Sequence, residues 1–324
     1  MWRVILDFLK MLIFPGILFA LSASLFYEWI DRKFYAKLQN RVGPHVAGPF
    51  GTLQPLADFI KLLSKEDIVP AAADKALFTL APILAPFLLL FAIMFLPIAG
   101  LSGILSFEGD LVVAVAIMSL YSVIVYVAGQ ASTSRFASIG AERSVLQLIG
   151  YEIPLTLSLI SVALGANSLR ISDIVAAQAE RGLWFILGPQ ALGFAIFLIA
   201  AQAEMERVPF DVPEAEQEIV AGWLVEYSGR RLALFRLSKD LELFYLSGLA
   251  ATAFLGGPLG PTLPGLEPVL YTVYFVIKSI VVLLLFTVIR GIFARLRIDQ
   301  VLSFCWKYLV PLSILLVLIT RVVV

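Results

Sequence analysis

The residues best suited to chemistry in this sequence are carboxylates that crowd one stretch of an otherwise apolar chain. The stretch reads EMERVPFDVPEAEQEIVAGWLVEY and covers residues 204–227. It lies between two long hydrophobic segments, where ionisable groups are costly unless they face water or a partner. Carboxylates placed this close together can bind and release protons near neutral pH. They are Glu204, Glu206, Asp211, Glu214, Glu216, Glu218 and Glu226.

Two prolines indicate the element that positions these carboxylates. Pro209 and Pro213 interrupt helical structure, and Pro213 is favourable in the first turn of a new helix. On that helix Glu214 and Glu218 would share a face, with Glu226 further along on roughly the same side. The sequence therefore predicts an acidic helix face at a membrane boundary, with a role in proton transfer. A solvated acidic loop is the alternative.

Another carboxylate is predicted to lie inside a membrane-spanning helix. Glu152 stands between Tyr151 and Ile153-Pro154, about two turns into an apolar segment. Pro154 cannot donate to the carbonyl of Gly150, so a free carbonyl, a phenol and a carboxylate would share one turn and could hold water. Intramembrane carboxylates are rare, which favours a proton path over a structural hydrogen bond between helices.

The composition is that of an integral membrane protein. Hydrophobic residues make up 60% of the 324 residues, the mean hydropathy is +0.94 and the formal net charge is +0. One cysteine, Cys305, and one histidine, His45, cannot supply the ligands of an iron–sulfur cluster or a zinc site. We therefore expect no metal, no redox group and no catalytic residue in this chain, and no nucleic-acid partner.

The sequence predicts an all-α polytopic protein with a single membrane domain over residues 1–324. A span needs about 20 apolar residues. Within the first polar loop, Leu53, Leu56, Ile60 and Leu63 recur at helical spacing, which predicts a short amphipathic helix, either at the membrane surface or packed as an ordinary helix on other loops. Eight spans are expected, at Val4–Ile30, Ala76–Pro97, Leu111–Ala128, Val145–Gly165, Trp184–Ala203, Leu232–Leu255, Val269–Arg290 and Leu302–Thr320.

The distribution of basic residues predicts the orientation. Most of the 24 lysines and arginines lie in or beside the connections after spans one, three, five and seven, whereas the loops after spans two and six contain none. The positive-inside rule then places the odd-numbered loops in the cytoplasm and both termini outside. The acidic stretch and the basic first loop would share the cytoplasmic side, where they could bind a soluble partner or a polar head group.

Four stretches, in order along the chain, resemble motifs of one respiratory family. They are EWIDRKFYAKLQNRVGPHVAGPFGTLQPLADFIKLLSKEDIVP, GQASTSRFASIGAERSVLQLIGYE, AEMERVPFDVPEAEQEIVAGWLVEYSG and RLRIDQVLSFCWKYLVPLSI. Through them the chain is identified as a member of the family formed by the H subunits of bacterial complex I, a NADH–quinone oxidoreductase. The mitochondrial counterpart of that family is NADH–ubiquinone oxidoreductase chain 1. The length and the number of spans agree with it.

The resemblance implies a non-redox subunit of a multisubunit, ion-translocating oxidoreductase of the respiratory chain, inactive by itself. Such a subunit anchors a peripheral redox arm and forms the membrane side of a quinone chamber. It links electron transfer to the translocation of protons or sodium ions. The implied partners are antiporter-like membrane subunits, cytoplasmic iron–sulfur and hydrogenase-like subunits, and the lipid bilayer. A quinone would bind at the interface, and the iron–sulfur clusters would belong to partner subunits.

The resemblance also assigns residues to two roles. Those at the quinone chamber or at the docking surface for the redox arm are Arg32, Lys33, Gln39, Arg41, Gly43, Pro44, Arg207 and Phe210. Those on the coupling or proton path are Tyr151, Glu152, Glu204, Asp211, Glu214, Glu216, Glu218 and Glu226.

Departures from the family pattern cluster around the chamber and leave the electron acceptor open. Asp31 stands where Glu is usual, His45 where Asn is usual, and Glu206 adds an acid to the acidic motif. One alternative is the homologous subunit of an archaeal ferredoxin-linked membrane-bound hydrogenase or sulfane-sulfur reductase, with no quinone, although the long first loop favours the quinone form. A stand-alone ion transporter would predict inverted repeats, and none is visible. A purely structural anchor would not need Glu152 inside a span.

Overall fold

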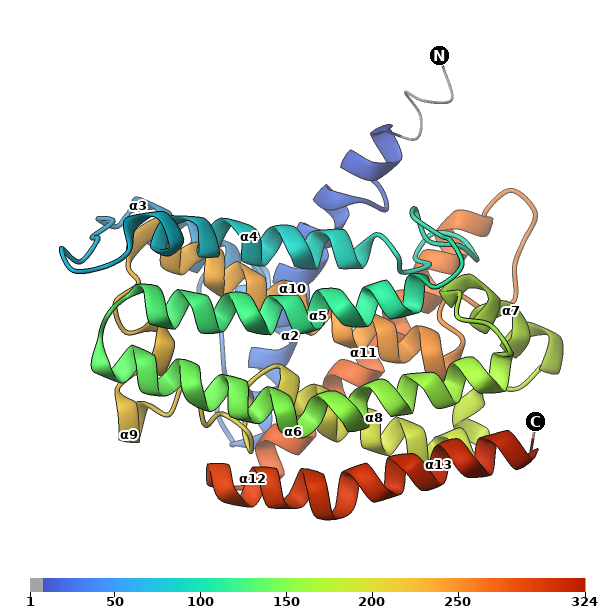
Figure 1. Ribbon diagram of the computed structural model, residues 1–324. Coiled ribbons are helices and arrows are strands. Elements are labelled where there is room, and N and C mark those ends of the chain that lie inside the picture. Colours follow the sequence, from blue (N-terminus) through green and yellow to red (C-terminus); the bar gives the residue numbers. More distant parts are fainter. Residues whose placement is uncertain (1–7, 324) are drawn as a thin grey trace.

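The computed structural model describes residues 8–323, which form a bundle of roughly aligned long helices (Figure 1). No β-strand occurs within this range. Six helices are long and apolar enough to cross a membrane. The protein is therefore a polytopic, all-α membrane protein, as the sequence predicts. The first predicted span starts at Val4, and residues 4–7 lie outside the described residues.

The helices follow the hydrophobic segments of the sequence, with short connections between most of them. Asp74 caps one of them, since its Oδ1 atom accepts a hydrogen bond from the backbone nitrogen of Ala76 at 3.0 Å. In chain order the helices are α2 (Ile17–Leu38), α3 (Gln54–Ser64), α4 (Lys75–Ile93), α5 (Asp110–Ala131), α6 (Arg135–Ala166), α7 (Ile171–Arg181), α8 (Gln190–Glu204), α9 (Glu216–Ile219), α10 (Gly229–Leu255), α11 (Glu267–Ile292), α12 (Ile298–Phe304) and α13 (Val310–Val323). A π-helical turn at Cys305–Leu309 joins the last two helices into one rod.

All eight predicted spans fall on helices, but two of those helices do not qualify as spans by length and hydropathy. Helix α8 has 15 residues and begins at Gln190, because the preceding residues form a short 3-10 turn that ends at Gly188-Pro189. Helix α10 has 27 residues but carries several charges in its first half. The structure thus supports six spans and does not confirm eight.

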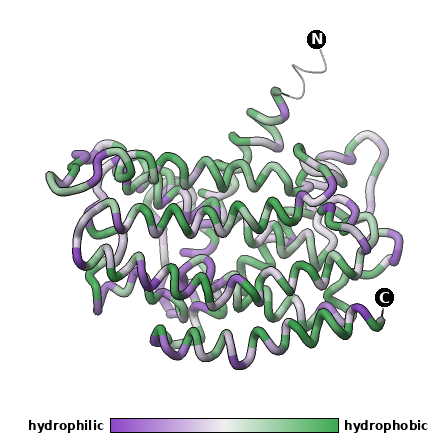
Figure 2. The backbone as a smooth tube through the Cα atoms, viewed as in Figure 1, coloured by the Kyte–Doolittle hydropathy of each residue, from purple (hydrophilic) through white to green (hydrophobic). Residues whose placement is uncertain are grey.

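Helix α10 runs through the centre of the bundle, where it packs against α2, α4 and α11 (Figure 1). Small residues allow these close approaches. A Cβ atom added at Gly248 would lie 2.9 Å from the ring of Phe275 on α11 and 3.0 Å from Leu96. Figure 2 shows hydrophobic residues along the long helices and hydrophilic residues gathered in the connections at both ends of the bundle.

The predicted amphipathic helix is α3, which confirms the periodicity seen in the first loop. Its outward residues Leu56, Ile60 and Leu63 are exposed, while Phe59 is half-buried and packs against the core. Asp58 points toward α2, where it binds Arg32. Helix α3 therefore presents an apolar face to its surroundings and a charged face to the interior of the protein.

Candidate functional site

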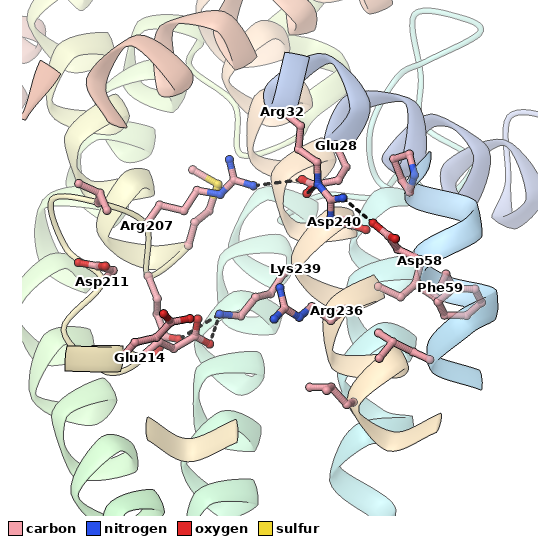
Figure 3. A pocket seen from close by; sticks show the side chains of 18 of the residues that line it. Glu28, Arg32, Asp58, Phe59, Arg207, Asp211, Glu214, Arg236, Lys239 and Asp240 are labelled. Atoms are coloured by element: carbon pink, nitrogen blue, oxygen red, sulfur yellow. Dashed lines mark hydrogen bonds and ion pairs between the residues drawn. The ribbon is translucent and has the colours of Figure 1, made fainter. Parts of the chain in front are cut away.

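A cleft of about 590 Å³ opens between α2, α3, α10 and the loop that precedes α9 (Figure 3). Seven acidic and eight basic side chains are among its 23 lining residues, so the lining is strongly charged but nearly balanced. The acidic ones are Glu28, Asp58, Glu206, Asp211, Glu214, Glu216 and Asp240. The basic ones are Arg32, Lys61, Lys65, Arg207, Arg236, Lys239, Arg290 and Arg295.

On the α2 side of the cleft, Arg32 joins two carboxylates. Its Nε atom lies 2.5 Å from Glu28 Oε1, and its Nη1 atom lies 2.7 Å from Asp58 Oδ2 (Figure 3). Partial burial disfavours the charged form of Asp58, but the hydrogen bonds from Arg32 and Gln54 outweigh it and lower the pKa of Asp58. Asp58 therefore stays a carboxylate at neutral pH and holds α3 against α2.

Deeper on the same side, Asp31 is a buried carboxylate shared by two arginines. Asp31 Oδ2 lies 3.2 Å from Arg207 Nη1 and 2.9 Å from Arg290 Nη1, and Thr287 Oγ1 donates to Asp31 Oδ1 at 2.7 Å. Burial opposes the charge on Arg207, but the nearby Asp31 and Glu28 prevail and raise the pKa of Arg207. These contacts tie the acidic loop to α2 and α11.

The acidic stretch does not form the predicted helix with one acidic face. Helix α9 is only four residues long, and Val220 and Gly222 after it have φ angles of 66° and 55°. The chain folds back there so closely that a Cβ atom at Gly222 would lie 1.8 Å from the carbonyl oxygen of Pro213. The prediction was wrong because this reversal depends on a glycine and on a contact with residues nine positions earlier, not on local helix preference.

As a consequence, the predicted carboxylates face different partners. Glu214 forms an ion pair with Lys239 of α10 inside the cleft. Glu218 lies outside the cleft, where Arg143 Nη1 is 2.5 Å from its Oε2 atom and its side chain is 51% exposed. Asp211 binds Arg295, while Glu226 is half-buried and does not line the cleft.

Glu206, the additional acid of the stretch, lies at the inner end of the cleft. Its carboxylate accepts hydrogen bonds from Ser144 Oγ at 2.6 Å and from Trp223 Nε1 at 3.1 Å, and Lys239 Nζ lies 3.7 Å away. Burial raises the pKa of Glu206, an effect that the charge of Lys239 opposes. Burial thus favours the neutral form of the Glu206 carboxyl group.

Beyond Glu206 lies a small inner cavity of about 10 Å³, close to the minimum for one water molecule. It is lined by Tyr121, Ser122, Val125, Ser144, Glu204, Glu206, Lys239 and Glu242. Glu204 and Glu242 are only 4% and 2% exposed, and one oxygen of each has no hydrogen-bond partner within residues 8–323. Such oxygens are acceptors for a bridging water.

The predicted pair Tyr151 and Glu152 connects to this cavity through α5. The hydroxyl of buried Tyr151 lies 3.2 Å from Ser122 Oγ, and Ser122 lines the cavity. Glu152 of α6 is half-buried and accepts a hydrogen bond from Ser119, which lies on α5 like Ser122. Both hypotheses for Glu152, a proton path and a hydrogen bond between helices, are compatible with this contact.

Most of the first-loop residues assigned through the resemblance lie away from the cleft, and only Arg32 lines it. Lys33 Nζ donates to the carbonyl of Pro44 at 2.7 Å, and Gly43 has a φ angle of 71°. This hydrogen bond and the turn at Gly43 together shape the loop. Gln39 and Arg41 are exposed and bind each other. Their role in docking a redox arm stays a prediction.

From the acidic loop, Arg207 lines the cleft but Phe210 does not. Phe210 is buried, and its carbonyl accepts a hydrogen bond from Gln147 Nε2 at 2.8 Å. Its visible contribution is to hold the loop against α6.

Several site residues were missed by sequence reasoning, above all Lys239 and Asp240 of α10. The sequence does contain a pattern that could have indicated them, since two adjacent charges interrupt the apolar segment Leu232–Leu255. Intramembrane charges of this kind indicate function. The partner of Lys239, Glu214, comes from another segment of the chain and could not be inferred from the sequence.

Comparisons with known proteins place the chain among respiratory subunits. A family model described as NADH dehydrogenase matches residues 10–321. An H subunit of the NADH-quinone oxidoreductase of Geobacter sulfurreducens is 45% identical over 311 residues, which cover 93% of this chain and 91% of that relative. The H subunit of the same enzyme from Dehalococcoides mccartyi is 41% identical over 304 residues, covering 93% and 83%. That of Thermomicrobium roseum is 39% identical over 338 residues, covering 99% and 96%.

Proposed function

The chain belongs to the NADH dehydrogenase family as a membrane subunit of the complex I type, and from this premise we propose that it couples electron transfer to ion translocation. In this proposal it holds no redox group of its own. It supplies the membrane side of the electron-acceptor chamber and a set of buried carboxylates that carry protons or admit sodium ions. The electrons are held by iron–sulfur clusters in partner subunits.

One observation carries the coupling role, namely the continuity of ionisable groups from the cleft into the bundle. Glu206 lines both the cleft and the inner cavity, and Glu204 lines the inner cavity. From there Ser122 leads to Tyr151, whose neighbour in sequence is Glu152. Buried carboxylates linked by hydroxyl groups and space for water support proton transfer across an apolar bundle.

The cleft suits the head group of a quinone. Its volume of about 590 Å³ falls within the usual range for small-molecule sites. Arg32, Arg207 and Arg236 would offer donors to the oxygens of the head group, and Arg236 forms no ion pair within the described part of the chain. A bound quinone would supply a two-electron acceptor, and the residues of this chain would orient it and exchange protons with the surrounding carboxylates.

We also propose that the cleft end of the bundle faces the cytoplasm. Support comes from the acidic loop, whose Arg207 pairs at the cleft with Asp31 at the start of the basic first loop. The C-terminal end of α13 lies at the end of the bundle opposite to α3 and α9 (Figure 1). Both termini would then be outside, antiporter-like subunits would adjoin the membrane helices, and a redox arm with hydrogenase-like and iron–sulfur subunits would dock over the cleft.

The coupling role is tested by Glu152→Gln in the assembled complex, reconstituted into sealed vesicles. The measurement is the number of ions moved per electron transferred. Because glutamine keeps the shape but cannot titrate, we expect this ratio to fall at least about tenfold. Glu180→Gln, an exposed acid at the far end in α7, is the matched control and should keep the wild-type ratio. An unchanged ratio in Glu152→Gln leaves only the hydrogen bond with Ser119 as its role.

The charged lining favours a second candidate, a ferredoxin-linked hydrogenase or sulfur-reducing complex of the same family that binds no quinone. Fifteen of the 23 lining residues are ionisable, whereas small-molecule pockets are mostly apolar. In that case the cleft would relay charge between the redox arm and the bundle. Supplying the intact complex with quinone, protons or sulfur compounds as acceptors, in parallel assays, distinguishes the two candidates.

A further inference from the structure

Lys239 occupies the boundary between the cleft and the inner cavity. Only two residues, Lys239 and Glu206, line both of these cavities, as far as residues 8–323 show. Glu206 is held in place by Ser144 and Trp223, whereas the Lys239 side chain is flexible by nature and 21% exposed. A charge that passes from the cleft to the cavity therefore passes between Lys239 and Glu206.

The ammonium group of Lys239 has carboxylates on both sides of this boundary. On the cleft side it forms an ion pair with Glu214 (Figure 3). On the cavity side its Nζ atom lies 3.7 Å from Glu206 Oε2. The ring of Trp223 lies beside it, with the centroid 5.5 Å from Nζ, and attracts the ammonium through a cation–π contact. The group is thus hydrogen-bonded to Glu214, and a second carboxylate, Glu206, lies close to it on the cavity side.

The cavity side also offers carboxylate oxygens that have no hydrogen-bond partner in the described part of the chain. Glu242 follows Lys239 by three residues on α10, so the two side chains lie on the same face of the helix, one turn apart. Glu242 and Glu204 are almost fully buried, and each has an oxygen without a hydrogen-bond partner among residues 8–323. Both side chains line the cavity, which has room for about one water.

We propose that Lys239 is a proton carrier between the cleft and the inner carboxylates. This proposal deepens the proposed function and rests on it. An N–H bond of the Lys239 ammonium breaks, and an O–H bond forms on Glu242 or Glu204, directly or through one water. The neutral amine is then protonated by Glu214, which takes its own proton from solvent in the cleft. One proton moves inward, and no electron is transferred.

The competing explanation is that Lys239 only holds the acidic loop on α10 through its ion pair with Glu214. The two explanations differ in what arginine can replace. Arginine keeps the positive charge and the ion pairs, but its guanidinium is not deprotonated in proteins. A structural role is rescued by Lys239→Arg, and a carrier role is not.

The experiment compares Lys239→Arg and Lys239→Gln with wild type in the assembled complex in sealed vesicles, with ions moved per electron as the readout. The matched control is Lys278→Arg. Lys278 is also a lysine of a membrane helix, but its Nζ atom donates to the carbonyl of Leu259 at 2.8 Å. The residue lines neither cavity. We expect Lys239→Arg to assemble and to lose at least about tenfold in ions per electron, while Lys278→Arg keeps the wild-type ratio.

A normal ratio in Lys239→Arg overturns the proposal, whatever Lys239→Gln does. If Lys239→Gln fails to assemble, Lys239→Arg decides alone, because it preserves the ion pairs. The Glu152→Gln variant distinguishes failure of the carrier proposal from failure of the proposed function. A low ratio in Glu152→Gln together with a normal ratio in Lys239→Arg rejects the carrier but keeps the proposed function, and normal ratios in both variants reject both.

Discussion

The two halves of α10 lie in the same helix but in opposite surroundings. From Gly229 to Glu242 the helix carries six charged residues and borders the cleft, whereas every residue from Leu243 to Leu255 is buried and none carries a charge. Some charges of the first half have partners from elsewhere, such as Asp67, which lies 2.5 Å from Arg231, and others, such as Arg236, line the cleft. In this helix, charges thus lie where other elements supply opposite charges or a polar cleft.

The largest effect is expected from placing a charge in the apolar half. Leu246 is fully buried, so Leu246→Lys would leave an unpaired ammonium in the core, and we expect no assembled protein to accumulate. Leu232→Lys is the matched control in the charged half, because Leu232 is half-buried and lines the cleft. It should assemble. Assembly is measured by the yield of the intact complex from membranes, and equal yields for both variants would remove the distinction between the halves.

A smaller loss is expected from removing a partner that stabilises the charged region. Asp31→Ala would leave Arg207 and Arg290 without the 1%-exposed carboxylate between them, and loss of one member of a buried pair costs about 3–5 kcal/mol. Asp58→Ala removes a carboxylate that is 31% exposed, and surface pairs contribute only about 0.2–1 kcal/mol. Thermal unfolding of the two variants should rank them in that order. The reverse order would mean that the Asp31 cluster does not stabilise the fold.

The smallest expected effect is a pH dependence of stability that arises from Glu206. Its pKa is raised by burial above the usual 4.5, although Lys239 opposes this and Glu214 adds to it. The neutral Glu206 carboxyl group therefore stabilises the fold fully at pH values below 4.5. This stabilisation is lost as the pH rises through the raised pKa of the folded protein. The melting temperature of wild type should accordingly fall relative to that of Glu206→Gln as the pH increases. A difference that stays constant with pH would show that Glu206 does not titrate in the folded protein.

Hydropathy and periodicity were sufficient to predict the long helices and α3. The span of α5 and the outward row of Leu56, Ile60 and Leu63 follow directly from local sequence. The fold of residues 213–224 was not predictable in this way. It depends on a backbone contact between Gly222 and Pro213, and helix preference alone says nothing of such a contact.

The candidate site was predictable only in part, because its charges are paired across the sequence. The acidic stretch and Glu152 stand out as rare charges in an apolar chain, and Arg207 and Arg32 do line the cleft. The Asp31–Arg290 pair joins residues that are 259 positions apart. Local patterns identify charges that need partners, but they do not identify the partners.

The central claim, that buried carboxylates of this chain change protonation when the assembly transfers electrons, is tested most directly by infrared difference spectroscopy of the intact complex. Protonated carboxyl groups have a carbonyl band of their own, so a redox-induced change in that band reports proton transfer. Glu204→Gln should remove part of this change, because Glu204 lines the inner cavity and one of its oxygens has no hydrogen-bond partner within residues 8–323, and Glu180→Gln should not alter it. A difference spectrum of Glu204→Gln identical to that of wild type would contradict the account.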